Sequence, residues 1–372
     1  MKKLLCFFAG LLVSIHAQAD PAASGEAIAA AINKRDLEGV LATIDVDAVH
    51  RLVLKDLALK DTDREALRKG LPKGLRNNLG IGMKSIEASK GTAKYVRAGK
   101  RGAKPYALVR MDLGDEGTDY VEYFLTPAGK VEDWYVHSMA TLYSSSARLS
   151  LATIFKTDSM LYGLFGSRAA SSADVKPFTD LRVNLQAQDY AAAYRTLERF
   201  PEEFRKTRQW ALMRVTYGAR TDDDTHRAAL RHLAANFGSD PELQFIFIDH
   251  HLFEEQFDRA LGSVAALERA IGGEDGATAN LRGTILAAAR RFDAAAPACR
   301  RGMALEPDYK PAYWCLVNAG LASKSGKVAI EGLQAYERAF GTEFNLDKLA
   351  ALEPYHELAR TPEFAAWKKS RR

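Results

Sequence analysis

The densest acid–base cluster of the sequence lies on an expected strand near residue 135. Asp133, Tyr135 and His137 alternate along the chain and therefore share one face of that strand. Residues two apart on a strand are separated by about 6.6 Å and residues four apart by about 13 Å, so Asp133 cannot orient His137 directly. Asp112 or Glu122 on a neighbouring strand would complete such a site if the register allowed it. A solvated outer face accounts for the polar residues equally well, and a hydrolase centred on His137 ranks behind the two binding functions considered below.

A second cluster has the residue types of a metal site. Asp249, His250 and His251 are followed by Glu254 and Glu255. On a helix each histidine shares a face with one glutamate, which gives two ligands where zinc needs three or four. We therefore expect a helix end with local ion pairs and no metal site. The sequence also lacks a Gly-x-Ser-x-Gly elbow, a phosphate-binding Gly-rich loop and a paired-cysteine metal signature, so no cofactor and no catalytic residue is assigned.

The chain has three cysteines, of which Cys6 lies in the N-terminal apolar stretch described next. Cys299 and Cys315 are 16 positions apart on what look like successive helices. In an oxidising compartment they could form a disulfide, which requires Cα atoms within about 7 Å. Two buried thiols that fill core positions are the equal alternative.

Residues 1–19 have the three parts of a bacterial signal peptide. Lys2 and Lys3 give a charged start, residues 4–15 an apolar stretch of about 12 residues, and residues 17–19 (Ala-Gln-Ala) a small-x-small cleavage site. The apolar stretch is shorter than the roughly 20 residues that cross a bilayer, and no later segment is apolar enough to cross one. We expect a periplasmic or secreted protein with a cleaved signal peptide of the Gram-negative type.

Length and composition limit the class of protein further. A chain of 372 residues predicts two domains, and 47% hydrophobic with 27% charged residues excludes a disordered chain. Without Lys2 and Lys3 the chain keeps 50 of its 52 basic residues against 47 acidic ones, a net charge of about +3. This excess is too small to indicate nucleic acid or an anionic membrane as the main partner.

The expected N-terminal domain, residues 21–165, changes from helical to strand periodicity. Apolar spacing predicts helices over 25–34, 46–59 and 63–77, and alternation over 83–139 predicts an antiparallel meander of four or five strands. Helices followed by a curved antiparallel sheet resemble the nuclear-transport-factor-like cone fold, also called SnoaL-like. The resemblance implies a pocket between helices and sheet that takes a small ligand, or a dimerisation module.

A basic run occupies residues 84–104, which contain a single acidic residue, Glu87. Such a run could meet phosphate or an acidic partner, whereas charged edge strands that resist aggregation are the simpler interpretation. The basic residues of this run are Lys84, Lys90, Lys94, Arg97, Lys100, Arg101 and Lys104.

Residues 149–165 are apolar and are expected to form a connector helix, and residues 166–175 are expected to form a linker.

Residues 176–344 repeat a pair of helices about every 34 residues, which predicts about five stacked hairpins. Tyr190, Thr225, Phe257 and Phe292 open the second helices of successive hairpins, and a fifth lies near Ala329. A small residue follows three positions later in each case and allows neighbouring helices to approach closely. These small residues are Ala193, Ala228, Ala260, Ala295 and Gly332.

The segment from Phe292 to Leu316 resembles the tetratricopeptide repeat, because Ala295, Gly302, Pro307, Ala312, Tyr313 and Leu316 fall at its small, proline, aromatic and leucine positions. Pro177, Gln244 and Arg282 depart from that pattern. The resemblance implies an all-α solenoid whose first helices line a concave groove that holds a peptide or protein. Residues 345–372 are expected to form capping helices.

On the pattern of that repeat, the side chains facing the groove combine aromatic rings with amide and hydroxyl groups, which suits an extended peptide. The alternative is that several of these rings pack against the N-terminal domain or the next helix. The predicted groove residues are Phe178, Arg182, Trp210, Met213, Tyr217, Phe245, Asp249, Asn280, Thr284, Trp314 and Asn318.

The sequence thus predicts an α+β N-terminal domain followed by an all-α solenoid of helical hairpins. The leading hypothesis for its function is an exported, non-catalytic adaptor that binds a peptide or protein partner in the groove, with an optional homodimer contact through the N-terminal domain. The alternative is a periplasmic carrier of a small molecule or lipid that uses the cone pocket, with the repeats as scaffold.

Overall fold

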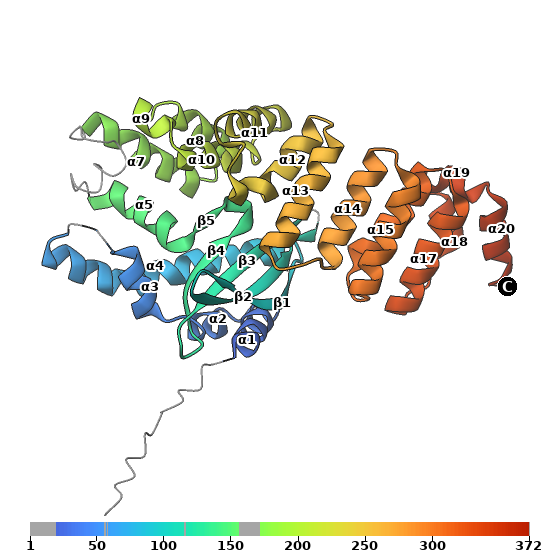
Figure 1. Cartoon of the computed structure of the whole chain (residues 1–372), viewed down its shortest axis with the longest axis horizontal. Coiled ribbons are helices and arrows are strands. Elements are labelled where there is room, and N and C mark those ends of the chain that lie inside the picture. Colours follow the sequence, from blue (N-terminus) through green and yellow to red (C-terminus); the bar gives the residue numbers. More distant parts are fainter. Residues whose placement is uncertain (1–19, 56, 58, 115–116, 156–171, 372) are drawn as a thin grey trace, which may run out of the picture.

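The computed structural model describes residues 20–55, 57, 59–114, 117–155 and 172–371 (Figure 1). The expected signal peptide, residues 1–19, and most of the expected linker lie outside these ranges. Within them, an α+β domain is followed by stacked helical hairpins, so the predicted fold class is confirmed. Each helix of the described ranges falls short of the length or apolarity that a membrane crossing requires.

The N-terminal helices are α1 (Pro21–Asn33), α2 (Leu37–Ala42), α3 (Val46–Val53) and α4 (Asp61–Ala88). Each of the first three begins after an aspartate whose carboxylate accepts a hydrogen bond from a backbone amide of the first turn. Such caps satisfy amides that have no partner within the helix. The capping residues are Asp20, Asp36 and Asp45.

Helix α4 is longer than its sequence predicted. The prediction ended it at Asn77 and began the sheet region at Met83, but the helix continues to Ala88 and contains Met83. Leu75 and Met83 are buried, whereas Gly70 and Gly74 are exposed. The helix is therefore held by one narrow apolar stripe, which continues past the predicted end of the helix to Met83.

The sheet is an antiparallel meander in the order β1-β2-β3-β4-β5. Val109 of β2 pairs with Tyr95 of β1 and Val121 of β3, and Glu122 of β3 pairs with Tyr135 of β4. Helix α5 (Tyr143–Phe155) follows the sheet. The strands are β1 (Thr92–Arg101), β2 (Lys104–Asp112), β3 (Thr118–Leu125), β4 (Val131–Val136) and β5 (Thr141–Leu142), with a short 3-10 helix η2 (His137–Met139) between the last two.

The outer edge of the sheet is strand β1, and a side chain covers part of it. The side-chain Nδ2 of Asn33 donates to the backbone carbonyl oxygen of Ala93 at 2.8 Å. The backbone N–H of Ala93 donates to the side-chain Oδ1 of Asn33 at 2.7 Å. These are the two hydrogen bonds that a neighbouring strand would make. Asn33 thus satisfies the backbone of the edge strand at this position.

The two faces of the sheet contact different parts of the chain. Val109 and Val121 point to one face and pack in a core with Ile28 and Ile32 of α1. Tyr120 points to the other face and shares a core with the helices of the repeats. Alternation along the strands therefore places the sheet between the N-terminal helices and the repeats.

The repeats form a tetratricopeptide-like stack. Their second helices begin at residues 190, 223, 257, 292 and 326, which gives separations of 33, 34, 35 and 34 and confirms the predicted period. The hairpins are α7 (Ser172–Gln186) with α8 (Tyr190–Leu197), α10 (Arg208–Gly218) with α11 (Asp223–Phe237), α12 (Gln244–Phe253) with α13 (Phe257–Ala270), α14 (Gly276–Ala288) with α15 (Phe292–Leu305), and α16 (Lys310–Ala322) with α17 (Gly326–Phe340); α9 (Glu202–Arg205) and η3 (Pro241–Leu243) lie between them.

Close approach of paired helices depends on small residues. A Cβ added to Gly320 on α16 would lie 2.3 Å from the backbone nitrogen of Ala329 on α17. In the second hairpin the predicted small residue, Ala228, is exposed, because α11 begins at Asp223 and not at Thr225. There Gly218 of α10 provides the close contact to α11.

The solenoid extends beyond the sheet at its C-terminal end. The sheet lies beside α10, α12 and α14, whereas α15 to α20 continue past it (Figure 1). The final short helices pack on α17 through a core that includes Leu349 and Trp367. They are α18 (Leu346–Ala350), η4 (Glu353–Tyr355), α19 (His356–Ala359) and α20 (Pro362–Lys369).

Candidate binding cleft between the sheet and the repeats

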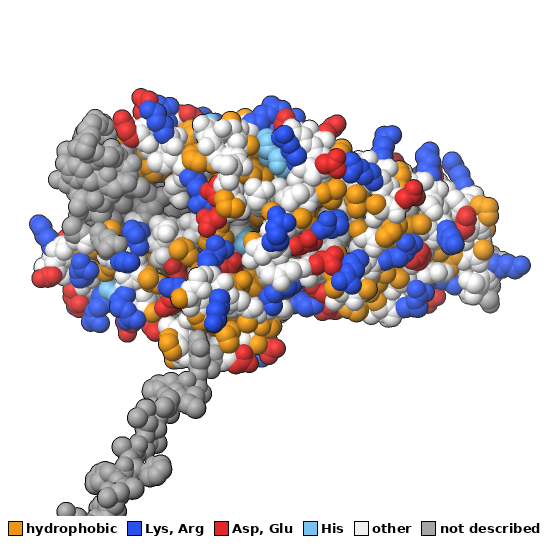
Figure 2. All heavy atoms as spheres, viewed as in Figure 1, with side chains coloured by type: hydrophobic (Ala, Val, Ile, Leu, Met, Phe, Trp, Pro, Cys, Tyr) orange, Lys and Arg blue, Asp and Glu red, His pale blue; other side chains and the backbone are white. Residues whose placement is uncertain are grey.

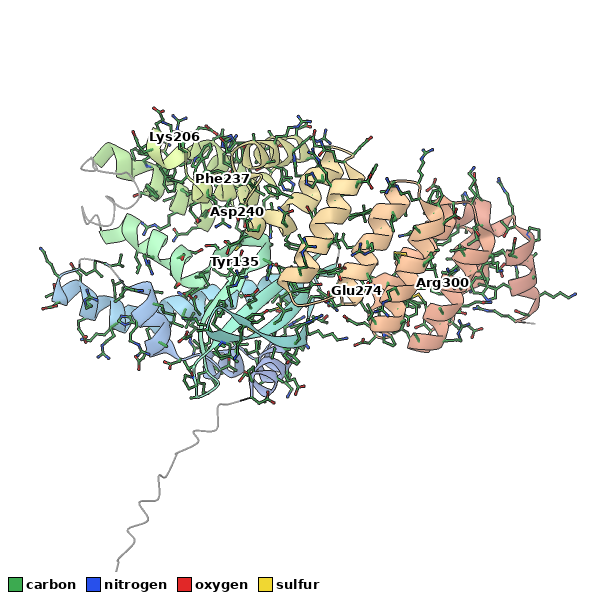
Figure 3. The ribbon with its side chains drawn as sticks, viewed as in Figure 1. Tyr135, Lys206, Phe237, Asp240, Glu274 and Arg300 are labelled. Atoms are coloured by element: carbon green, nitrogen blue, oxygen red, sulfur yellow. A yellow bond between two sulfur atoms is a disulfide. The ribbon has the colours of Figure 1, made fainter. Side chains whose placement is uncertain are left out.

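Basic side chains of strand β1 reach across to the repeats. Lys94 donates to Glu306 at 2.9 Å and to Asp308 at 3.0 Å, both in the loop between α15 and α16. Arg97 donates to the carbonyl oxygen of Glu274 at 3.1 Å. Glu274, labelled in Figure 3, lies where the loop before α14 meets the sheet. For Lys94, the acidic partner that the basic run could meet is therefore the protein's own solenoid, and Arg97 binds backbone carbonyl oxygens of the same solenoid.

Arg110 of β2 is the centre of this contact and is only 1% exposed. Its Nη1 lies 3.1 Å from Asp275 and 2.7 Å from Glu306, and its Nη2 lies 2.9 Å from the second oxygen of Glu306. Its Nε donates to Asp112 at 2.9 Å, and its guanidinium stacks over the ring of Tyr309. A buried guanidinium is stable only when paired in this way, so the cluster fixes the position of the sheet on the repeats.

Two carboxylates beside Arg110, those of Glu306 and Asp112, have shifted pKa values. Burial acts to raise the pKa of Glu306, but the hydrogen bonds and charge of Arg110 outweigh it and lower that pKa to about 2. Burial raises the pKa of Asp112, although Arg110 opposes the shift. Asp275 accepts a hydrogen bond from the hydroxyl of Tyr120 at 2.9 Å. Glu306 is thus the carboxylate most strongly held in its charged form.

The acid–base cluster of the sequence is a closed ion-pair network. His137 Nε2 lies 2.9 Å from Glu122, so the neighbouring strand does supply the partner. Arg101 donates to both oxygens of Glu122 at 2.8 Å, and Asp133 instead accepts from the Ser144 hydroxyl at 2.6 Å. Burial acts to raise the pKa of Glu122, but His137 and Arg101 lower it. Its carboxylate is therefore engaged on both oxygens and unavailable as a base in this arrangement.

The metal-like cluster does not assemble a ligand set. Glu254 pairs with Arg231 at 2.8 Å, and burial lowers the pKa of both His250 and His251. Within the described part of the chain, no group of three or more His, Cys, Asp or Glu side chains is arranged to hold a metal ion. The two histidines occupy half-buried positions on α12 beside Phe247.

A cleft of about 1060 Å³ lies between the Arg110 face of the sheet and the inner helices α10, α12 and α14. On the face shown in Figure 2, Lys and Arg side chains intermingle with Asp and Glu where the sheet meets the repeats. The cleft wall likewise combines apolar groups with charged and amide groups. Among its lining residues are Thr118, Tyr120 and Met139 on the sheet side, and Phe245, Asp249 and Asn280 on the repeat side.

Of the predicted groove residues, Phe245, Asp249 and Asn280 line this cleft. Phe178 and Trp210 are each only 4% exposed and fill core positions. Phe178 packs edge-on against Phe200, and the Trp210 indole nitrogen donates to a backbone oxygen of α8.

The remaining predicted groove residues lie elsewhere on the solenoid. Met213 and Tyr217 are half-buried against the core that the repeats share with the sheet. Trp314 is half-buried against Tyr336 of α17. The exposed ones are Arg182, Thr284 and Asn318.

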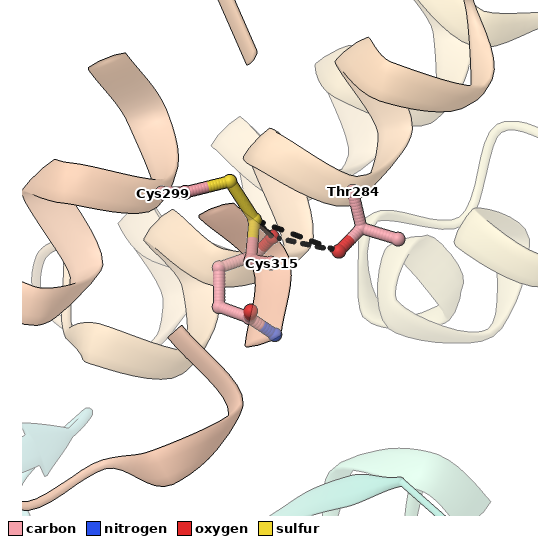
Figure 4. Close-up of a disulfide and its surroundings, with 4 residues drawn as sticks. Thr284, Cys299 and Cys315 are labelled. Atoms are coloured by element: carbon pink, nitrogen blue, oxygen red, sulfur yellow. Dashed lines mark hydrogen bonds between the residues drawn. A yellow bond between two sulfur atoms is a disulfide. The ribbon is translucent and has the colours of Figure 1, made fainter. Parts of the chain in front are cut away.

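Cys299 of α15 and Cys315 of α16 are joined by a disulfide in the structure, with their Cα atoms 5.5 Å apart (Figure 4). The bridge connects the two helices whose intervening loop supplies Glu306 and Tyr309 to Arg110. The Thr284 hydroxyl lies 4.0 Å from the Cys315 Sγ (Figure 4). The disulfide thus ties together the two helices that flank the loop in contact with the sheet.

Fold and cleft together define a helical-repeat protein with an α+β domain packed on the inner wall of its repeats. No protein-family model and no curated protein sequence matches the chain.

Solved structures resemble it weakly. PilW, described as a widely conserved type IV pilus biogenesis factor, aligns with a TM-score of 0.36 and 15% identity over 54% of this chain and 93% of PilW. MamA MSR-1 aligns with a TM-score of 0.36 and 14% identity over 45% of this chain and 95% of MamA. MamA AMB-1 aligns with a TM-score of 0.35 and 16% identity over 47% and 97%. At these TM-scores the likenesses do not bear on function.

Proposed function

We propose that the protein is a non-catalytic binding protein that holds a segment of a partner polypeptide in the cleft between its sheet and its repeats. The observation that carries this proposal is the cleft itself, about 1060 Å³ in volume. Pockets for small molecules typically measure about 300–1,000 Å³. This cleft is at the upper end of that range and lies between a sheet and a row of helices. It therefore suits a polypeptide segment better than a single small ligand.

The cleft wall offers the groups that a peptide needs. Phe245 supplies an aromatic surface, and the Asn280 amide is able to donate to and accept from a peptide backbone. Helical repeats commonly bind extended segments through such a combination of rings and amides. The sheet side adds the hydroxyl of Thr118 as a further polar contact.

The alternative of a small-molecule carrier required a pocket between the N-terminal helices and the sheet. That space holds the packed side chains of Ile28, Val109 and Val121, and the large cleft opens on the opposite face of the sheet. The cone-fold relationship inferred from the order of the elements therefore lends no support to a carrier function. Native mass spectrometry of the purified protein would reveal a retained small ligand, and the same spectra give the oligomeric state that tests the proposed homodimer.

Photo-crosslinking from matched asparagine positions tests the peptide-binding function. A crosslinking amino acid replaces Asn280 in the cleft, Asn318 on the solenoid beyond the sheet, or Asn236 on α11 outside the cleft. We expect Asn280 to give crosslinks to peptide segments of a partner, identified by mass spectrometry, and Asn236 to give none. Equal labelling from all three positions, or none from Asn280, would contradict the proposal.

We also propose that the protein is exported. This rests on the signal-peptide pattern of residues 1–19 and on the disulfide between Cys299 and Cys315, since disulfides persist mainly in oxidising compartments. N-terminal sequencing of the protein from a periplasmic fraction should find Asp20 as the first residue. A chain that stays in the cytosol with Met1 intact would refute export.

A further inference from the structure

The inner wall of the repeats already recognises cationic side chains, because it holds those of the sheet. Arg110 and Lys94 bind Glu306, and Arg101 of β1 contacts Glu242 of η3 at 3.2 Å. The carboxylates in these pairs belong to loops and helix starts along one side of the solenoid. The docked sheet thus shows which chemistry this wall binds.

Asp249 lies on the same wall, and it has no such partner among the residues that the structure describes. It lines the cleft on α12 and is exposed, and no side chain of the described ranges donates a hydrogen bond to it or forms an ion pair with it. Burial raises its pKa, and the nearby His226 of α11 only partly opposes that shift. Because the Asp249 side chain is exposed to the cleft, the cation of a bound segment can reach its carboxylate.

Two other charged groups that line the cleft, Arg220 and Asp119, have partners of their own. Arg220 of α10 stacks over the ring of Tyr190, and Asp119 of the sheet accepts two hydrogen bonds from Ser138. Burial lowers the pKa of His226, which favours its neutral form at neutral pH. Among the residues that the structure describes, no neighbour of Asp249 therefore neutralises its carboxylate.

Apolar groups beside this carboxylate suit a long side chain. Phe245 precedes Asp249 by one helical turn and lines the cleft, as does Met139, which is 41% exposed. The methylene stem of lysine or arginine packs on such surfaces while its cation reaches a charged group. An aromatic ring beside a carboxylate is a common setting for a bound basic side chain.

We propose that the partner segment bound in the cleft carries a lysine or arginine whose cation pairs with Asp249. This inference rests on the proposed function, since it names the chemistry of the segment that the cleft holds. Charge complementarity with the docked sheet, whose Lys94 and Arg110 pair with Glu306 of the same wall, favours a basic segment over an acidic or apolar one.

A positional-scanning library of capped nonapeptides tests the proposal. Binding of each fluorescent pool to the full protein is measured by anisotropy at two salt concentrations. We expect pools with lysine or arginine at one position to bind best, with weaker binding at higher salt. Asp249→Asn should weaken that binding about tenfold and abolish the preference for a basic residue.

Asp224→Asn is the matched control, because Asp224 is exposed on α11 outside the cleft, and it should bind as the wild type does. Unchanged melting curves would show that both variants fold. Peptides that bind without a basic preference, or that bind Asp249→Asn as tightly as the wild type, would overturn this inference and leave the proposed function standing. Failure of every pool to bind would overturn both.

Discussion

The two faces of the sheet contact the rest of the molecule in opposite ways. On one face Val109 packs in an apolar core with Ile28 and Ile32. On the other face its neighbour Arg110, also buried, is held by Asp275 and Glu306 of the repeats. Adjacent residues of one strand thus belong to an apolar core and to an ionic contact between domains.

The apolar face of the sheet mainly stabilises the N-terminal domain, whereas the ionic face determines where the sheet docks on the repeats. Apolar burial stabilises the N-terminal domain in proportion to its area and tolerates small changes of shape. A buried charge requires a partner at the correct distance, so the Arg110 cluster accepts one docking position of the sheet. That position leaves part of the inner wall open, and the cleft with Asp249 lies there.

The largest effect is expected from breaking the ionic face. Arg110→Ala leaves the carboxylates of Asp275 and Glu306 buried without their cation, which should lower the free energy of unfolding by about 3–5 kcal/mol. Val109→Ala, its neighbour on the apolar face, should cost about 2 kcal/mol. Urea unfolding followed by circular dichroism measures both. If the two substitutions cost the same, the distinction between the faces fails.

The disulfide should rank next, because it ties the helices that present Glu306 to the sheet. Its loop of 16 residues predicts a loss of about 3 kcal/mol for the double variant Cys299→Ser, Cys315→Ser. Titration of the unfolded, non-reduced protein should find these two cysteines without free thiols. Two free thiols would instead support the alternative of buried cysteines that fill core positions.

A subtler change displaces one carboxylate of the ionic face. A Cβ added to Gly276 would lie 2.7 Å from the Glu306 Cβ and 2.9 Å from its Cδ, so Gly276→Ala must move this side chain away from Arg110. We expect a loss of about 1–3 kcal/mol. Gly70→Ala on α4 is the control, because nothing lies within 4 Å of its added Cβ, and it should gain about 0.5–1 kcal/mol. A neutral Gly276→Ala would argue that Glu306 is not held tightly.

Acid should weaken the ionic face gradually. The pKa of Glu306 is lowered from its ordinary 4.5 to about 2, so its stabilisation is complete above pH 4.5 and is lost as the pH falls towards 2. Asp112, whose pKa burial raises, takes up a proton earlier and acts in the opposite sense. Glu306→Gln should flatten the fall of stability across this window relative to the wild type. Parallel curves would show that another group governs it.

The repeats were the most predictable part of the fold. Successive hairpins have nearly the same total length, so the spacing of Tyr190, Phe257 and Phe292 gave the period directly. The end of α4 was not predictable, because burial of Leu75 and Met83 against the rest of the protein outweighs the low helix propensity of the glycines in this helix.

The site was predictable only in part. Phe245, Asp249 and Asn280, which line the cleft, were assigned to a groove from the pattern of the repeat that the sequence resembles. The same pattern placed Phe178 and Trp210 there, but it does not distinguish a groove position from a core position against the next helix, where both side chains are buried. Arg110 was overlooked, although an arginine within the apolar run of β2 was a signal for a buried partner; its distant carboxylates are brought near only by tertiary folding.

The side-chain amide of Asn33 affects how readily separate molecules associate through the edge of the sheet. An exposed edge strand is a template for pairing with another chain, and repeated pairing of this kind leads to fibrils. Because the side chain of Asn33 occupies both backbone groups of Ala93, a second molecule cannot extend the sheet in register past this residue. A single side chain thus helps to keep the sheet from growing between molecules in concentrated solution.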